Sequence, residues 1–183
     1  MGDHELDEVL PAAALGEAWA LRIVYDHLAP RVQGYLRAHG ASEPEDLTSE
    51  VFMAVLPRLA TVTGGGAGLS ALTFSVAHAR LVDDLRRRAR RGTAVEFDAQ
   101  LDPRRAPSAE TEAASALQTQ AVQTLLERLP DVQRDVLLLR IVADLTVEQV
   151  ALAMGRSAGA VKQLQRRGLL ALRAHLSEGG VPL

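Results

Sequence analysis

The chain contains no cysteine, and only 3% of its 183 residues are aromatic. Without cysteine it has no disulfides and no thiolate metal sites. The histidines show no spacing typical of metal ligands, so we expect neither a metal nor a cofactor. They are His4, His27, His39, His78 and His175. Because aromatic side chains are few, we expect a core built mainly from Leu, Val and Ala.

Long apolar runs are also missing from the sequence. No segment approaches the roughly 20 consecutive apolar residues that a membrane-spanning helix needs. The N-terminus, "MGDHELDEVL", is acidic, whereas a secretory signal would be basic there. We therefore expect a cytoplasmic protein that does not insert into a membrane.

Runs of β-branched or aromatic residues are scarce, whereas Ala, Leu, Arg and Glu are abundant. These four residue types favour helix. Apolar residues also recur at helical spacing, as in Phe52, Val55, Leu56 and Leu59, which lie at positions i, i+3, i+4 and i+7. The sequence therefore predicts an all-α fold.

The segment from Ala60 to Ser70, "ATVTGGGAGLS", interrupts this helical pattern. Three consecutive glycines each cost about 1 kcal/mol relative to alanine in a helix interior. We predict a mobile loop here, with helix resuming at about Ala71. That helix would end in a strongly basic run, "RRRARR".

Charge and composition divide the chain into segments. Residues 1–18 carry five acidic residues and no basic one, although the net charge of the whole chain is only -3. Residues 92–115 contain two prolines and no sustained apolar period, which is typical of a linker. We predict an acidic N-terminal tail (1–14), a small helical domain (15–91), a flexible linker (92–115), a second small helical domain (116–177) and a C-terminal tail (178–183).

Residues 145–173, "LTVEQVALAMGRSAGAVKQLQRRGLLALR", have the spacing of a helix-turn-helix motif. Ala151 is small enough for two helices to cross closely, and Gly155 permits the turn. Val161 and Leu164 would face the core from the second helix. The pattern therefore predicts two helices joined by a tight turn.

Capping residues mark the start of both helices of this motif. Thr146 with Gln149 predicts a capping box, and Ser157 predicts a cap on the second helix. Between Arg156 and Arg173 there are five basic residues and no acidic one. Such a helix suits DNA, because cations bind phosphates and an amide such as that of Gln163 can read base edges.

The candidate DNA contacts on this helix are Arg156, Ser157, Ala158, Ala160, Lys162, Gln163, Arg166 and Arg167. The alternative is that the segment is an ordinary solvated basic helix of a four-helix bundle.

Two longer stretches resemble a known family. "EDLTSEVFMAVLPRL" followed by "LSALTFSVAHARLVDDLRRRARR" looks like conserved region 2 of bacterial sigma factors. "LERLPDVQRDVLLLRIVADLTVEQVALAMGRSAGAVKQLQRRGLLALRAHL" looks like their region 4. Two such regions with only a short linker between them are similar to the extracytoplasmic-function, or group IV, class of the sigma-70 family.

This resemblance implies a subunit that gives RNA polymerase its promoter specificity. Region 4 would contact the β flap of core polymerase and read the minus-35 promoter element. The helix that contains Asp46 to Phe52 would dock on the clamp helices of the β′ subunit. The polymerase-binding candidates are Asp46, Leu47, Thr48, Ser49, Glu50, Phe52 and Met53, of which Phe52 also belongs to the predicted core.

The resemblance also implies that the glycine-rich segment and the basic helix after it recognise and melt promoter DNA near the minus-10 element. The candidates there are His78, Arg80, Asp84, Arg86, Arg87 and Arg88. Such proteins are often held inactive by an anti-sigma factor, so a partner of this kind is expected. The sequence departs from the family pattern at Ser49, where glutamine is usual, and at Leu72, where tryptophan is usual.

Two other classes compete with this interpretation. The first is a conventional helix-turn-helix regulator with an N-terminal sensing or dimerisation domain. The second is an enzyme, but Asp83 and Asp84 would point about 100° apart on a helix, and the glycine-rich segment lacks the lysine and hydroxyl residue of a phosphate-binding loop. We therefore expect a protein that is not an enzyme.

Overall fold

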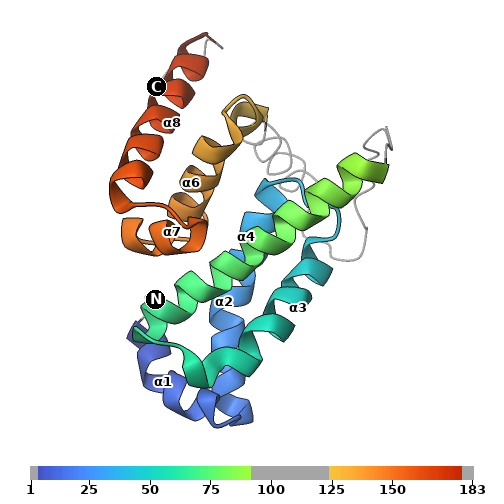
Figure 1. The fold of residues 1–183 in the computed structure, drawn as a ribbon, viewed down its shortest axis with the longest axis vertical. Helices are drawn as coiled ribbons and strands as arrows, with labels where there is room; N and C mark the ends of the chain where they lie inside the picture. Colours follow the sequence, from blue (N-terminus) through green and yellow to red (C-terminus); the bar gives the residue numbers. More distant parts are fainter. Residues whose placement is uncertain (1–3, 92–123, 179–183) are drawn as a thin grey trace, which may run out of the picture.

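The computed structural model describes residues 4–91 and 124–178, and every regular element in these ranges is helical (Figure 1). The N-terminal unit consists of α1 (His4–Ala14), α2 (Ala18–Ala38), α3 (Pro44–Val55), the 3-10 helix η1 (Leu56–Thr61) and α4 (Gly65–Arg91). The C-terminal unit consists of α6 (Asp131–Ile141), α7 (Val147–Met154) and α8 (Ala158–Glu178). The predicted all-α fold is confirmed, whereas the predicted linker 92–115 and most of the C-terminal tail, residues 179–183, lie outside the described residues.

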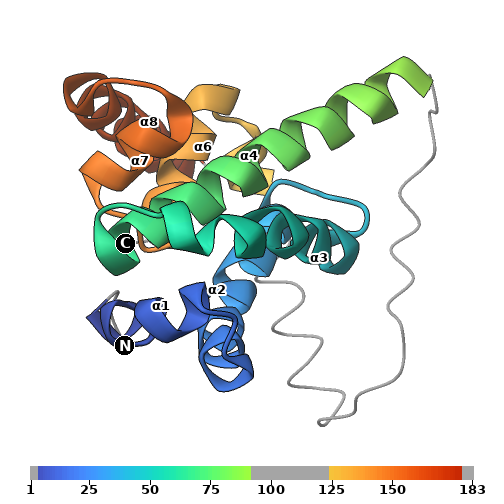
Figure 2. The ribbon, with the colours of Figure 1, turned by 60° about the horizontal axis from the view of Figure 1, so that its bottom comes forward.

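The long helix α4 is the element against which the others pack. It contacts α1, α2 and α3 of its own unit and α7 of the C-terminal unit. Leu69, Phe74, Ala77 and Leu81 carry its buried face. Its C-terminal turns extend beyond the neighbouring helices (Figure 2), so one helix provides both a core face and an exposed basic end.

Residues 4–14 form helix α1, so the prediction of a solvated acidic tail is wrong for this segment. Leu6, Leu10 and Ala13 are buried and pack towards α2 and α4. The carboxylate of Asp7 accepts a hydrogen bond from the backbone N–H of Gly66, at 2.6 Å. An acidic group at this point satisfies one of the free N–H groups at the start of α4 and complements the helix dipole.

The 3-10 helix η1 extends to Thr61 and α4 begins at Gly65, so only residues 62–64 of the predicted mobile loop lack helical structure. Gly65 has φ +61°, and a Cβ there would overlap Oδ1 of Asp7. A Cβ on Gly68 would overlap the carbonyl oxygen of Thr63 and lie 2.9 Å from its carbonyl carbon. These close approaches are possible only for glycine, and they outweigh its low helix propensity.

Alanine substitutions at two helical glycines should have opposite effects. Gly68→Ala should lower the free energy of unfolding by about 1–3 kcal/mol, because its Cβ meets the fixed backbone of Thr63. Gly159→Ala on α8 meets no atom within 4 Å and should raise that free energy by about 0.5–1 kcal/mol. Urea unfolding followed by circular dichroism measures both. Equal effects at the two positions would contradict the close-packing explanation.

The C-terminal unit has the predicted helix-turn-helix geometry. Gln149 N donates to Oγ1 of Thr146 at 3.2 Å, and Thr146 N donates to Oε1 of Gln149 at 2.6 Å, so the predicted capping box is confirmed. Gly155 ends α7 with φ +61°, and Oγ of Ser157 accepts from Ala160 N at 3.2 Å. Val161 is fully buried. The turn therefore forms as its residues predict.

The two units pack against each other. Helix α7 lies on α4, and α6 contacts α2 (Figures 1 and 2). Their buried apolar residues form one continuous cluster. On α2 the lack of a side chain at Gly34 leaves room for Val142, whose Cγ1 would lie only 3.2 Å from an added Cβ.

Candidate functional site

The outer side of α8 carries side chains suited to DNA contact. Lys162, Gln163, Arg166 and Arg167 are exposed, while Val161 points into the core. Within the part of the chain that the structure describes, no carboxylate forms an ion pair with any of the three basic side chains. Their positive charge is therefore available to phosphates.

The other predicted DNA contacts of this motif lie at the start of α8. Arg156 and Ser157 are exposed, and Ala158 and Ala160 are partly buried. The small side chains at these positions leave the N-terminal turn of α8 accessible. The structure thus places all eight candidates in the N-terminal half of α8 or directly before it.

The basic end of α4 is organised differently, because its arginines have acidic neighbours. Arg88 and Arg87 lie 3.1 and 3.9 Å from carboxylate oxygens of Asp84, and Arg86 lies 4.0 Å from Asp83. These pairs join residues three or four apart on one helix. The Arg86–Asp83 pair is exposed, and such a pair contributes only about 0–1 kcal/mol. The side chain of Asp84 is only 15% exposed, so its pairs with Arg87 and Arg88 are partly buried and hold these arginines in position.

Arg80, a minus-10 candidate, pairs with Glu50, a polymerase-binding candidate, at 3.8 Å. Both side chains are about two-fifths exposed, at 44% and 40%. The pair joins α4 to α3. The structure therefore brings the edges of these two predicted sites together.

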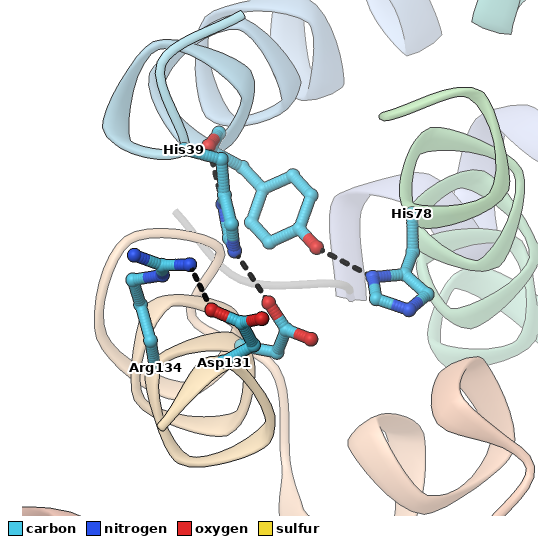
Figure 3. A network of polar contacts seen from close by, with 6 residues as sticks. His39, His78, Asp131 and Arg134 are labelled. Carbon is cyan, nitrogen blue, oxygen red and sulfur yellow. Dashed lines mark hydrogen bonds and ion pairs between the residues drawn. The ribbon is translucent and has the colours of Figure 1, made fainter. Parts of the chain in front are cut away.

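His78 lies at the inner side of α4 and is half-buried, so its prediction as a DNA contact does not fit this arrangement. Its Nδ1 lies 2.9 Å from Oη of the fully buried Tyr35 on α2 (Figure 3). Burial lowers the pKa of His78, Asp135 raises it and His39 lowers it. The net shift of this pKa is downward, which favours the neutral imidazole, and a neutral imidazole with an unprotonated Nδ1 can accept a hydrogen bond from the Tyr35 hydroxyl.

Because the pKa of His78 is below the ordinary value of 6.5 in the folded chain, its neutral form contributes stability that is present above pH 6.5 and is lost as the pH falls through the lowered pKa. His78→Leu should lower the free energy of unfolding by about 0.5–1.5 kcal/mol at neutral pH. That loss should shrink on acidification. Urea unfolding of both proteins between about pH 5.5 and 7.5 measures it, and a loss that grows with acid would contradict this role.

Helix α3 divides the polymerase-binding candidates into two groups. Asp46, Ser49 and Met53 are exposed at i, i+3 and i+7, with Glu50 partly exposed beside them. The side chains of Leu47, Thr48 and Phe52 lie in the core, so their prediction as direct contacts is wrong in this structure. They are 5%, 3% and 3% exposed.

The reason for this division is the phase of the helix. Thr48 donates its hydroxyl hydrogen bond to Pro44 O at 2.6 Å, and the Phe52 ring packs 4.7 Å from that of Tyr25. Val51 and Val55 lie on the same buried side. The buried residues therefore fix the orientation of α3, and the exposed residues on its other side form the candidate polymerase surface.

An open hollow beside Ser49 adds residues of α2 that the sequence analysis missed. It has a volume of about 330 Å³ and is lined by both α2 and α3, including Tyr25, Asp26, Gln33 and Ser49. Tyr25 is 43% exposed. Its exposure beside α3 extends the candidate polymerase surface onto α2.

A second open hollow, also of about 330 Å³, lies beneath residues 62–64. Leu72, the residue that departs from the family pattern, lines it together with Arg58, Val62 and Ser75. Leu152 of α7 contributes to the same hollow. The departure at Leu72 thus places a smaller side chain under the loop that precedes α4.

Within residues 4–91 and 124–178, no helix has the length and apolarity to cross a membrane. No three His, Asp or Glu side chains there gather as metal ligands would.

Comparison with known proteins gives consistent results. The family model described as "Sigma-70, region 4" matches residues 125–174. ECF RNA polymerase sigma factor SigD of Mycobacterium tuberculosis (strain ATCC 25618 / H37Rv) is 32% identical, covering 98% of this chain and 88% of that protein. ECF RNA polymerase sigma factor ShbA of Streptomyces griseus is 34% identical, covering 88% and 90%. The solved structure of CnrH in complex with the cytosolic domain of CnrY has a TM-score of 0.71 at 18% identity, covering 94% and 97%, and shows the same fold.

The chain belongs to the ECF RNA polymerase sigma factors of the sigma-70 family, and it directs transcription initiation. Its relatives match across both units, which decides against a conventional regulator with an unrelated sensing domain. The resemblance inferred from the two quoted stretches is therefore confirmed.

Proposed function

We propose that the C-terminal unit reads the minus-35 promoter element through α8. The observation that carries this proposal is the set of exposed cations Lys162, Arg166 and Arg167 beside the exposed amide of Gln163. None of the three pairs with a carboxylate of residues 4–91 or 124–178. The cations anchor phosphates, and Gln163 contacts a base edge in the major groove. The protein itself catalyses no covalent step.

Removing the side chains that bind phosphates should weaken binding to every promoter sequence to a similar extent. The triple variant Lys162→Ala, Arg166→Ala, Arg167→Ala should have a lower affinity, as the holoenzyme, for all its promoters, by a similar factor for each. The slope of log affinity against log salt should flatten by about 0.9 for each lost phosphate contact. Binding is measured by fluorescence anisotropy over a salt series.

Arg173→Ala provides the matched control, because Arg173 is exposed on the same helix but lies beyond the proposed contacts. It should leave the salt slope unchanged. A triple variant with the wild-type slope would show that α8 does not bind phosphates.

The N-terminal unit is proposed to recognise and melt the minus-10 element with α4 and residues 62–64. Arg80, Arg86, Arg87 and Arg88 bind phosphates of the separated strands, which offsets part of the cost of unstacking bases. Asp84 holds Arg87 and Arg88 in place rather than touching DNA, because only 15% of its side chain is exposed. His78 supports the inner side of the helix.

The exposed stripe of α3 is proposed to dock on the β′ clamp helices of core polymerase. It presents Asp46, Ser49, Glu50 and the apolar side chain of Met53, which is 67% exposed. On the C-terminal unit, the exposed apolar side chains of Leu169 and Leu170 support a contact with the β flap. The protein meets polymerase in the cytoplasm.

Met53→Ala should weaken binding to purified core polymerase by about 1–2 kcal/mol, since a truncated interface anchor loses buried apolar contact. Its thermal unfolding should stay unchanged because Met53 is exposed. Leu15→Ala is the matched control, with an apolar side chain 83% exposed in the connection between α1 and α2. If both variants bind equally well, the clamp contact lies elsewhere.

An anti-sigma factor is proposed as a second protein partner. CnrH, which shares this fold, is bound to the cytosolic domain of CnrY in its solved structure. In the present chain, the exposed apolar side chains of Trp19, Ile23 and Met53 support a surface for such a partner. The partner would compete with polymerase for the stripe on α3.

Run-off transcription with core polymerase across fragments of the native genome tests the proposal as a whole. Initiation at a defined set of fragments is expected, and alignment of those fragments yields the recognised promoter elements. A protein that neither binds core polymerase nor initiates on any fragment would refute it.

A further inference from the structure

The start of α4 has no capping side chain of its own. Gly64, the residue directly before the helix, has φ +82° and no side-chain atom that could accept a hydrogen bond. Residues 65, 66 and 68 are also glycines, which form helix poorly. The first turn of α4 therefore needs an acceptor for its free N–H groups from another part of the chain.

Asp7 of α1 supplies this acceptor. Its Oδ1 accepts a hydrogen bond at 2.6 Å from the backbone N–H of Gly66, the second residue of α4. A helix N-cap side chain normally binds an N–H at this position or the next. Figures 1 and 2 show the beginning of α1 beside the start of α4. A carboxylate from another helix thus takes the place of the missing cap.

The position of this carboxylate is fixed by the helix that carries it. Leu6 and Leu10 of α1 are 0% and 9% exposed, and α1 contacts α2, α4 and η1. Asp7 itself is an exposed residue, so it adds little to the core. Its specific contribution is the contact with the backbone of α4.

The contact extends from the first turn of α4 to the residues before it. A Cβ on Gly68 would overlap the carbonyl oxygen of Thr63, so the backbones of the helix and of residues 62–64 touch directly. Val62 and Thr63 line the hollow described above together with Leu72. A shift of the first turn of α4 would therefore move residues 62–64 and change the shape of that hollow.

We propose that Asp7 is a positioning residue for promoter opening. By capping α4 from α1, it holds residues 62–64 in the conformation that recognises the minus-10 element, and it does not touch DNA itself. This inference rests on the proposed function, in which α4 and residues 62–64 recognise and melt that element. The acidic first helix of the chain then takes part in promoter selection.

Amide hydrogen exchange in the free full-length chain tests the capping. In Asp7→Ala the amides of residues 66–68 should exchange about fivefold faster, the factor that loss of a typical N-cap represents. Asp7→Asn keeps an acceptor oxygen and should retain most of the slow exchange. Glu8→Ala, at the exposed neighbour on α1, is the matched control and should change nothing. Unchanged exchange in Asp7→Ala would overturn the capping.

Promoter opening by the holoenzyme tests the consequence for function. Permanganate reactivity of unpaired thymines follows the melting of the minus-10 element. Asp7→Ala should open promoters about fivefold more slowly and should discriminate less between the native minus-10 element and its single-base variants. Its affinity for core polymerase should stay unchanged, and Asp7→Asn should restore both the rate and the discrimination.

A variant that only lowers stability separates positioning from a general structural role. Ala13→Gly weakens α1 at its other end but leaves the carboxylate of Asp7 in place. It should lower the thermal unfolding temperature at least as much as Asp7→Ala does, while opening rate and base discrimination stay close to those of the wild type. If Ala13→Gly reproduces the loss of discrimination, Asp7 acts only through stability and the inference is overturned.

The same measurements distinguish this inference from the proposed function. If the wild-type holoenzyme opens no promoter, the proposed function fails and with it the role in opening, whereas hydrogen exchange still decides the capping. If Asp7→Ala opens promoters as fast as the wild type and with the same base preference, the function stands and the inference fails. A variant that instead binds DNA of every sequence more tightly would show that Asp7 keeps phosphates away from the helix end, which would also overturn positioning.

Discussion

The structure depends on α4 being one continuous helix from Gly65 to Arg91. Its first half is buried against α1, α2 and α3, and its last turns carry arginines in solvent. The glycines at its start let the chain turn sharply from η1 into the helix, and Asp7 satisfies the N–H of Gly66. Because the beginning of this helix is held in place, the basic residues at its solvated end keep a defined position relative to the core.

Much of this fold could be predicted from the sequence because its signals are local. The capping box at Thr146 and Gln149, and the turn at Gly155, formed as their chemistry indicates. The glycine-rich segment was mispredicted because its conformation depends on contacts with Asp7 and Thr63. Contacts with residues distant in the chain override intrinsic propensity, and no count of glycines reveals them.

Only part of the candidate site could be predicted, because local signals define some of its residues and long-range contacts define the others. The exposed side of α8 followed from Val161, whose buried position fixes the phase of the helix. On α3 the motif resemblance grouped inward and outward residues together, although the apolar Val51 and Val55 could have identified the inward side. The pairing of His39 with Asp135, on helices that lie far apart in the sequence, carries no local signal and required the three-dimensional structure.

The short connection at residues 62–64 has a consequence for how it meets a ligand. It is held between η1 and the anchored start of α4, with Gly68 N bonded to Gly64 O at 3.0 Å. Ordering a free backbone costs about 1–2 kcal/mol for each residue, and here folding has already restricted these residues. A nucleotide placed against them meets a preorganised surface, so little of its binding energy is lost to conformational entropy.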